Sequence, residues 1–150
     1  MSSILYDANF GTLKLSHQSS DLNSLAHAGY AFGTDTDNIV DNSVALKLLL
    51  FAILNLGSIT PTGAAHMRLF LVRSIDGTNY EDPQTAADPP AGMPGWSRGM
   101  FAGASAKVIL FGPILLSPGK SKILIGNSSG VSLAASGNSV KYWFTTYANV

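Results

Sequence analysis

The residues that come closest to a chemical site are the carboxylates around one tight turn, Asp76, Glu81 and Asp82. Two carboxylates that flank a cleft can hydrolyse a glycosidic bond. Asp76, Asn79 and Asp82 also offer oxygens at a spacing similar to a calcium loop, but the bidentate Glu at the far position is missing. Asp76 precedes Gly77, and Asp-Gly has a simpler interpretation, in which the carboxylate caps its own turn and glycine supplies a positive φ. The pattern therefore favours a structural turn at Asp76 and Gly77.

The other chemically capable residues are scattered along the chain. The histidines lack metal-ligand spacing to one another; they are His17, His27 and His66. A looser acidic group comprises Asp35, Asp37 and Asp41. No cysteine is present, which excludes disulfides, Cys-ligated zinc and thiol nucleophiles. Nucleophile-elbow and phosphate-loop motifs are also missing. We therefore expect no enzyme activity, no cofactor and no metal.

Composition indicates a folded protein that works through contacts. A chain of 150 residues is long enough for one domain with a real core, and it is 46% apolar but only 12% charged. Such a balance argues against disorder and predicts that part of the surface is apolar and meets a partner. The basic residues are spread singly, so nucleic-acid binding is not expected.

Charge is divided unevenly along the sequence. All nine carboxylates and four of the nine Lys and Arg residues lie in residues 1–88, and the other five cations lie in residues 89–150. In one interpretation, an acidic surface of one copy meets a basic surface of the next. In the other, strands from both halves interleave and the charges mix on the surface.

The chain shows no membrane or secretion signal. Its start has no basic segment leading into an apolar one. The longest apolar run, Val44 to Leu56, contains Lys47 and Asn55 and is too short to span a bilayer. We expect no membrane partner and assembly in a cytoplasm.

Residues 1–38 are predicted to form a mostly irregular arm, with one short strand near residues 12–16, and residues 39–150 a β-sandwich. The arm is rich in Ser, Asn, Asp, Gly and His, with scattered apolar side chains. Those side chains can dock on the domain itself or on a neighbouring subunit. The arm residues expected to make partner contacts are Leu13, Leu15, Tyr30 and Phe32.

The run Val44–Leu56 permits two interpretations. Leu and Ala favour a helix, and 13 residues would suffice for one. A helix here would be apolar on all sides except at Lys47, whereas the even positions from Val44 to Leu50 supply one continuous strand face. We therefore predict a buried strand.

The next strand begins at His66 and runs into the Asp76-Gly77 turn, and the chain is expected to return at once through Thr78 and Tyr80 as a hairpin. A long Pro- and Gly-rich loop is predicted over residues 81–104. Its large side chains either project toward a partner, which is the interpretation preferred here, or fold back over the end of the sandwich. The loop residues chosen as partner contacts are Trp96, Met100 and Phe101.

Three more strands are expected, at Lys107–Leu116, Lys122–Ile125 and Val140–Tyr147. Pro113 fits a bend or an edge strand. The last strand has aromatic side chains on both faces, which predicts that it is covered on both sides, one cover being a possible neighbouring subunit. The pattern predicts a single antiparallel, jelly-roll-like β-sandwich of about eight strands.

Two segments resemble known proteins. The strand that ends in Ser74-Ile75-Asp76-Gly77-Thr78-Asn79-Tyr80-Glu81-Asp82 is similar to a family of small β-sandwich proteins of tailed bacteriophage virions. The segment from Ile125 to Asn138 resembles the closing motif of the same family. The resemblance spans roughly the last two thirds of the chain and implies a virion structural protein.

Three functions follow from these expectations. The first is a capsid cement or decoration protein that binds across capsomer joints and contacts the major capsid protein or other virion proteins, as a homo-oligomer (trimer or dimer). The second is a tail, baseplate or fibre component, with Trp96, Trp143 and Tyr147 as possible sugar-stacking residues. The third is a glycan hydrolase that uses the Asp76–Asp82 region. The first is preferred.

Overall fold

The computed structural model describes residues 4–7, 12–35, 37–43, 47–74, 76–83 and 85–149. This part of the chain is almost entirely β-structure. The strands are β1 (Ile4–Asp7), β2 (Lys14–His17), β3 (Tyr30–Phe32), β4 (Ile39–Asn42), β5 (Lys47–Ile59), β6 (His66–Ser74), β7 (Gly95–Gly99), β8 (Ser105–Leu115), β9 (Gly119–Ser128) and β10 (Ser139–Asn149). The single described helix is the four-residue α1 (Ser19–Leu22).

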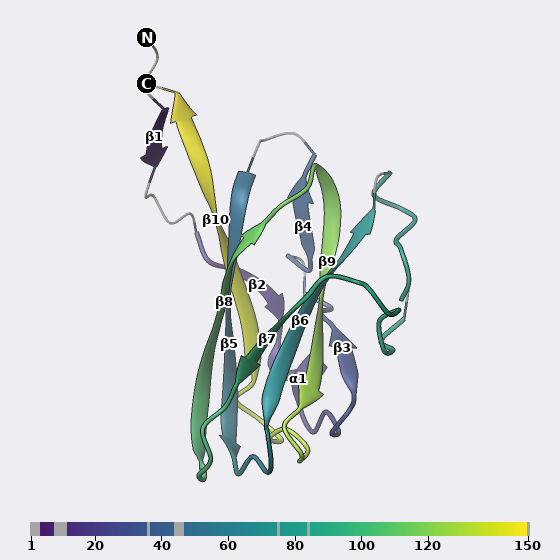
Figure 1. Ribbon diagram of the computed structural model, residues 1–150, viewed down its shortest axis with the longest axis vertical. Coiled ribbons are helices and arrows are strands. Elements are labelled where there is room, and N and C mark those ends of the chain that lie inside the picture. Colours follow the sequence, from purple (N-terminus) through teal and green to yellow (C-terminus); the bar gives the residue numbers. More distant parts are fainter. Residues whose placement is uncertain are drawn as a thin grey trace.

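The strands form two antiparallel sheets in two layers (Figure 1). Sheet A has the order β1–β10–β5–β8, and β2 pairs with β10 beside β1. Sheet B has the order β3–β9–β6–β7, and β4 pairs with β9 beside β3. From β2 onward the chain crosses between the sheets at every connection except β3–β4 and β6–β7, which stay in sheet B; this is the strand order of a jelly roll. The predicted all-β, jelly-roll-like sandwich is confirmed.

Strand β5 confirms the strand interpretation of the long apolar run. Its even-numbered side chains are buried between the sheets; they are Leu50, Ala52, Leu54 and Leu56. Because successive side chains in a strand point to opposite faces, the odd-numbered residues lie on the outer face of sheet A. Residues 44–46 of the run lie outside the described residues.

The main core fills the space between the two sheets. Sheet B contributes Met67 and Ile125, and sheet A contributes Phe111 and Tyr142, all of them buried. The Tyr142 hydroxyl donates to the backbone oxygen of Asp37 at 2.9 Å, so this large side chain also satisfies its polar end.

The described part of residues 1–38 contributes three strands to the sheets, β1, β2 and β3, and also contains α1. His17 of β2 is buried and its Nε2 lies 3.1 Å from the backbone oxygen of Ala31 in β3. Its Nδ1 lies 3.0 Å from Ser16 Oγ. Burial lowers the pKa of His17 to about 4, so the ring is neutral at pH 7 and joins the edge of sheet A to the edge of sheet B.

Two buried asparagines close one end of the sandwich within the segment from Ile125 to Asn138. Asn127 Nδ2 donates to the backbone oxygens of Leu25 at 2.9 Å and Val131 at 2.8 Å. Asn138 Nδ2 donates to the Ala134 oxygen at 2.7 Å, and its Oδ1 accepts the Gly57 N–H at 3.0 Å. These side chains hold the loops in place through hydrogen bonds to backbone groups.

The connection from β6 to β7 differs from the predicted hairpin. The chain does turn at Gly77, but the next strand is β7, which pairs His66–Phe70 with Gly99–Gly95. The expectation of an immediate return strand is wrong, and residues 95–99 of the predicted loop 81–104 are strand. Gly95 allows this pairing because a Cβ there would lie 2.3 Å from Cε1 of Phe70.

Candidate interaction surface

The Asp76 carboxylate is engaged by its own turn. Its Oδ1 accepts the backbone N–H groups of Thr78 and Asn79, both at 2.8 Å, and the Ser74 hydroxyl at 3.0 Å. The backbone bonds from Asn79 and Thr78 hold the pKa of Asp76 well below its usual range. Gly77 has a φ of +78°. Both residues therefore have the turn geometry expected from Asp-Gly.

Glu81 extends the same turn back to β6. Its Oε1 accepts the backbone N–H of Arg73 at 3.0 Å and lies 3.3 Å from the Arg73 Nε. A hollow of about 570 Å³ lies beside this pair and is also lined by Asn79, Tyr80 and Ser117. Within the described part of the chain, no group of three His, Asp or Glu side chains is placed to hold a metal ion.

The outer face of sheet B is apolar and is covered by the protein's own chain. Three side chains of β6 and β9 form its centre: Phe70, Val72 and Leu124. They are buried under four partly buried side chains: Tyr30, Phe32, Tyr80 and Met93. Tyr80 and Met93 come from the β6–β7 connection, so this connection folds back onto the sheet.

An aromatic and ionic contact fastens part of this cover. The rings of Tyr30 and Phe70 have centroids 6.4 Å apart, and the Arg68 guanidinium carbon lies 5.2 Å from the centre of the Tyr30 ring. The Tyr30 hydroxyl donates to Asp88 and accepts from Arg68. The contact joins β3, β6 and the β6–β7 connection on one face.

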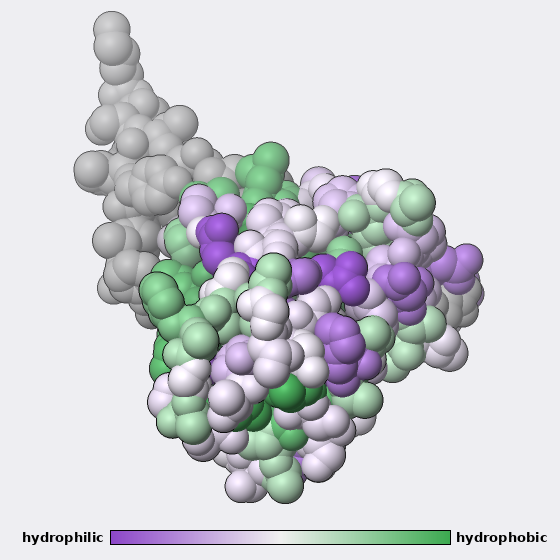
Figure 2. All heavy atoms as spheres, turned by 60° about the horizontal axis from the view of Figure 1, so that its bottom comes forward, coloured by the Kyte–Doolittle hydropathy of each residue, from purple (hydrophilic) through white to green (hydrophobic). Residues whose placement is uncertain are grey.

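The outer face of sheet A is also apolar, but the side chains on its edge strand β8 are exposed. Val108 is 74% exposed, Leu110 52% and Leu115 69%, and all three lie on β8. In the sheet register, Leu110 lies opposite Ile53 of β5. Figure 2 shows hydrophobic residues gathered along one side of the molecule, on the left, where Figure 1 places β5 and β8.

The apolar row continues from β5 onto β10. Phe51 of β5 stacks on Trp143 of β10, with ring centroids 5.4 Å apart and planes 11° from parallel. Ile53 lies opposite Lys141 of β10. Six apolar residues of this outer face are considered together: the half-buried Phe51, Ile53 and Trp143 of β5 and β10, and the exposed Val108, Leu110 and Leu115 of β8. We call this set the open face.

The free edge of β8 is protected against pairing with another strand. Arg98 Nε donates to the backbone oxygen of Leu110 at 3.3 Å. The register shifts between Leu50 and Ala52, opposite Pro113, which cannot donate to a ladder. Edge strands in soluble proteins carry such features because an unprotected edge recruits other strands. The Arg98 contact and Pro113 therefore disfavour the addition of another strand at this edge.

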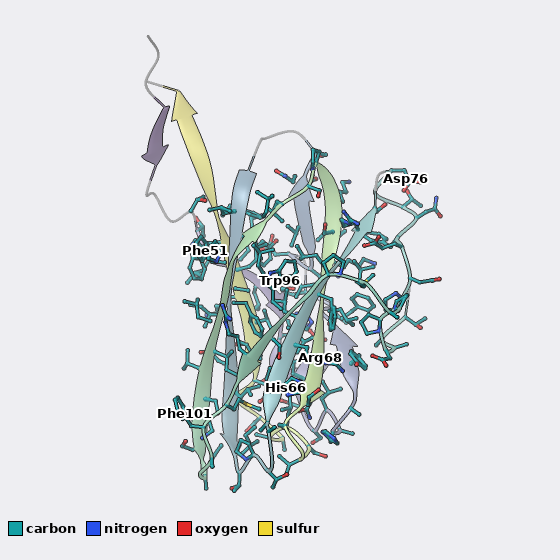
Figure 3. The ribbon with its side chains drawn as sticks, in the orientation of Figure 1. Phe51, His66, Arg68, Asp76, Trp96 and Phe101 are labelled. Atoms are coloured by element: carbon teal, nitrogen blue, oxygen red, sulfur yellow. The ribbon has the colours of Figure 1, made fainter. Side chains whose placement is uncertain are left out.

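The structure separates the predicted contact residues by their surroundings. Tyr30 and Phe32 lie in the cover of sheet B. Trp96 and Met100 pack against the main core, so Trp96 folds back over the sandwich, as in the second interpretation of the loop. Phe101 is 90% exposed (Figure 3).

The remaining two contact residues belong to the N-terminal segment. Leu13 is exposed, and Leu15 is half-buried on β2 opposite Lys141. The open face itself was not among the predicted contact residues. Its signal is an unbroken apolar run such as Val108–Phe111, which leaves apolar side chains on both faces of one strand.

No helix in the described part of the chain is long and apolar enough to cross a lipid bilayer. Comparison of the chain with protein-family models, with curated proteins and with solved structures finds no match. The open face and its surroundings are therefore the features of this protein that bear on its function.

Proposed function

We propose that this protein is a structural component of a bacteriophage virion, a decoration protein that cements the capsid by binding the major capsid protein or another virion protein through the open face. The observation that carries this proposal is the exposure of Val108, Leu110 and Leu115 on one sheet face. Contiguous exposed apolar surface marks interaction sites, because leaving it in water is unfavourable.

The composition of the open face agrees with a protein partner. Interface cores are rich in aromatic residues and poor in charge. The stacked Phe51 and Trp143 provide the aromatic centre, and Lys141 is the one charged residue that the described register places beside them. A decoration protein that binds only the assembled shell stabilises that shell by mass action. The jelly-roll architecture and the resemblance to virion β-sandwich proteins support the same function.

The test uses heads of the encoding phage prepared without this protein. Wild-type protein is expected to bind them and to raise the temperature at which they open. The double variant Ile53→Lys and Leu115→Lys places charges on the open face and should weaken binding by at least about tenfold. A matched control, Ser132→Lys, adds charge at an exposed loop position and should bind like the wild type.

Circular dichroism must show that the double variant melts cooperatively, since Ile53 is half-buried. A folded double variant that binds heads as tightly as the wild type would overturn the use of this face. Heads that never bind the wild-type protein would overturn the decoration function.

A second candidate is a tail or fibre module that binds carbohydrate, and one observation favours it. The hollow of about 570 Å³ near the Asp76 turn combines polar groups with the Tyr80 ring, as sugar sites often do. Specific binding on a glycan array that is lost in Tyr80→Ala and retained in Trp96→Ala would support this site. An array without binding would remove it.

A further inference from the structure

A groove lies at the edge of the sandwich, between β7 and β8 and next to the open face. It has a volume of about 420 Å³. Apolar side chains form much of its lining, including Met100, Phe101 and Val108. Phe101, 90% exposed, is one of its lining residues, and Figure 3 shows this residue beside β8, on the flank opposite Asp76. We call this hollow the edge groove.

Two cations line the edge groove, and neither has a carboxylate partner among the described residues. Arg98 donates through Nε to the Leu110 oxygen, and Lys107 Nζ donates to the Gly103 oxygen at 2.8 Å and Ser105 Oγ at 2.7 Å. The ion pairs of the described chain join other residues: Lys14–Asp37, Arg68–Asp88 and Arg73–Glu81. An apolar groove with uncompensated positive charge fits an occupant that is apolar and acidic.

The chain itself carries such a segment at residues 85–90, Thr-Ala-Ala-Asp-Pro-Pro. Its alanines are exposed, and the Asp88 side chain is 77% exposed. The consecutive prolines, Pro89 and Pro90, restrict the backbone before binding, so docking costs little conformational entropy. Proline-rich segments bind grooves lined by aromatic residues. The contact with Tyr30 also orders the Asp88 carboxylate.

The segment cannot fill the groove of its own molecule. Figure 1 places the β6–β7 connection on the right flank of the molecule and β8, a strand of sheet A, on the left flank. Asp88 is held on sheet B by Tyr30, and Tyr30 packs on Phe70 there. The occupant and the groove must therefore come from two molecules.

We propose that residues 85–90 of one copy dock in the edge groove of a second copy, with Asp88 between Arg98 and Lys107 and the prolines against Phe101. The contact joins two different surfaces, so copies associate head to tail. This inference rests on the proposed function and deepens it by naming a second copy as a partner. The groove and the open face share Val108, but the charged residues of the contact, Asp88, Arg98 and Lys107, lie outside the open face.

Sedimentation velocity of the purified chain over a range of concentrations and salt tests the contact. The wild type should associate as concentration rises. Association should be weaker at about 0.5 M salt than at about 0.1 M salt, because charges supply part of the attraction. The groove variant Arg98→Gln with Lys107→Gln, and the loop variant Asp88→Asn, should each stay monomeric. The control Lys141→Gln removes one cation outside the groove and should associate like the wild type.

Mixing the two variants gives the sharpest readout. The groove variant keeps an intact loop, and the loop variant keeps an intact groove. The mixture should therefore form dimers and nothing larger. A wild type that stays monomeric, a mixture that stays monomeric, or an equal loss of association in Lys141→Gln would overturn the inference. If the protein stays monomeric but still binds phage heads, the proposed function stands and the head-to-tail contact is removed. Association without head binding would leave the inference and remove the proposed function.

Discussion

The two sheets of this protein have outer faces of similar composition and opposite surroundings. On sheet B, Phe70, Val72 and Leu124 are buried because the chain between β6 and β7 returns over them. On sheet A, Leu110 and Leu115 are exposed. Apolar side chains alone therefore do not locate an interface. The informative feature is an apolar face that the described part of the chain leaves uncovered.

The two edges of the sandwich differ in a similar way. At one edge, His17 joins β2 to β3 through the Ala31 oxygen, so a buried contact links the sheets. At the other edge, the groove between β7 and β8 is lined by the exposed Phe101 and by Arg98 and Lys107, which have no carboxylate partner among the described residues. The covered face of sheet B and the edge joined by His17 bury their side chains within the protein, whereas the open face and the edge groove are the surfaces that we propose for assembly.

The largest expected effect comes from making the same substitution on both faces. Leu124→Ala removes a side chain that is 0% exposed and should lower the free energy of unfolding by about 2–5 kcal/mol. Leu115→Ala, on the open face, should change it by less than about 0.5 kcal/mol. Urea unfolding of both variants measures the difference. Equal losses would show that the two faces are not distinct in the free protein.

The buried His17 should make the free energy of unfolding depend on pH in the acid range. The folded pKa of His17, about 4, lies below its unfolded value of 6.5, so the unfolded chain binds more protons between these values. The contribution of His17 is therefore present above pH 6.5 and is lost as pH falls through 4, by about 3 kcal/mol in all.

Unfolding measured from pH 7 to pH 4 in the wild type and in His17→Gln checks this effect. The variant should lose the dependence in that window. The pKa of Asp76 lies below its usual range, so its contribution is lost only as pH falls below about 4. A wild-type stability that is flat from pH 7 to pH 4 would contradict the role given to His17.

A smaller effect is expected at the turn that begins the cover of sheet B. Gly77→Val places a β-branched residue at a φ of +78° and a Cβ 2.8 Å from the Cδ of Lys120. It should cost about 1–3 kcal/mol of unfolding free energy. Gly99→Val is the control, since its φ is not left-handed and a Cβ there meets no close atom. If calorimetry finds the two variants equally stable, the positive φ at Gly77 does not limit the stability of the protein.

Sequence reasoning reached the fold because its signals are local. The alternation in β5 and the Asp-Gly pair at residues 76 and 77 each depend on the residues themselves. The path after Gly77 depends on a distant requirement, the burial of Phe70 and Leu124, and it was therefore missed. Prolines in the connection also cannot supply the N–H groups of a return strand.

The candidate site was harder to predict because exposure is a long-range property. Trp96 and Phe101 are large aromatic residues five positions apart, yet Trp96 packs on the core and Phe101 is exposed. Residue type does not distinguish them. The exposure of Val108 similarly depends on which strand ends a sheet and on whether a loop returns over it.

Hydroxyl-radical footprinting read by mass spectrometry tests whether the open face is the binding surface, because it reports the solvent exposure of individual side chains. The protein is labelled free in solution and bound to phage heads. Binding should protect Ile53 and Leu115 strongly and leave the labelling of Tyr80 and Met93 unchanged. Equal labelling of Leu115 in the free and bound protein, or protection confined to the sheet B side, would show that the open face is not the surface that binds the head.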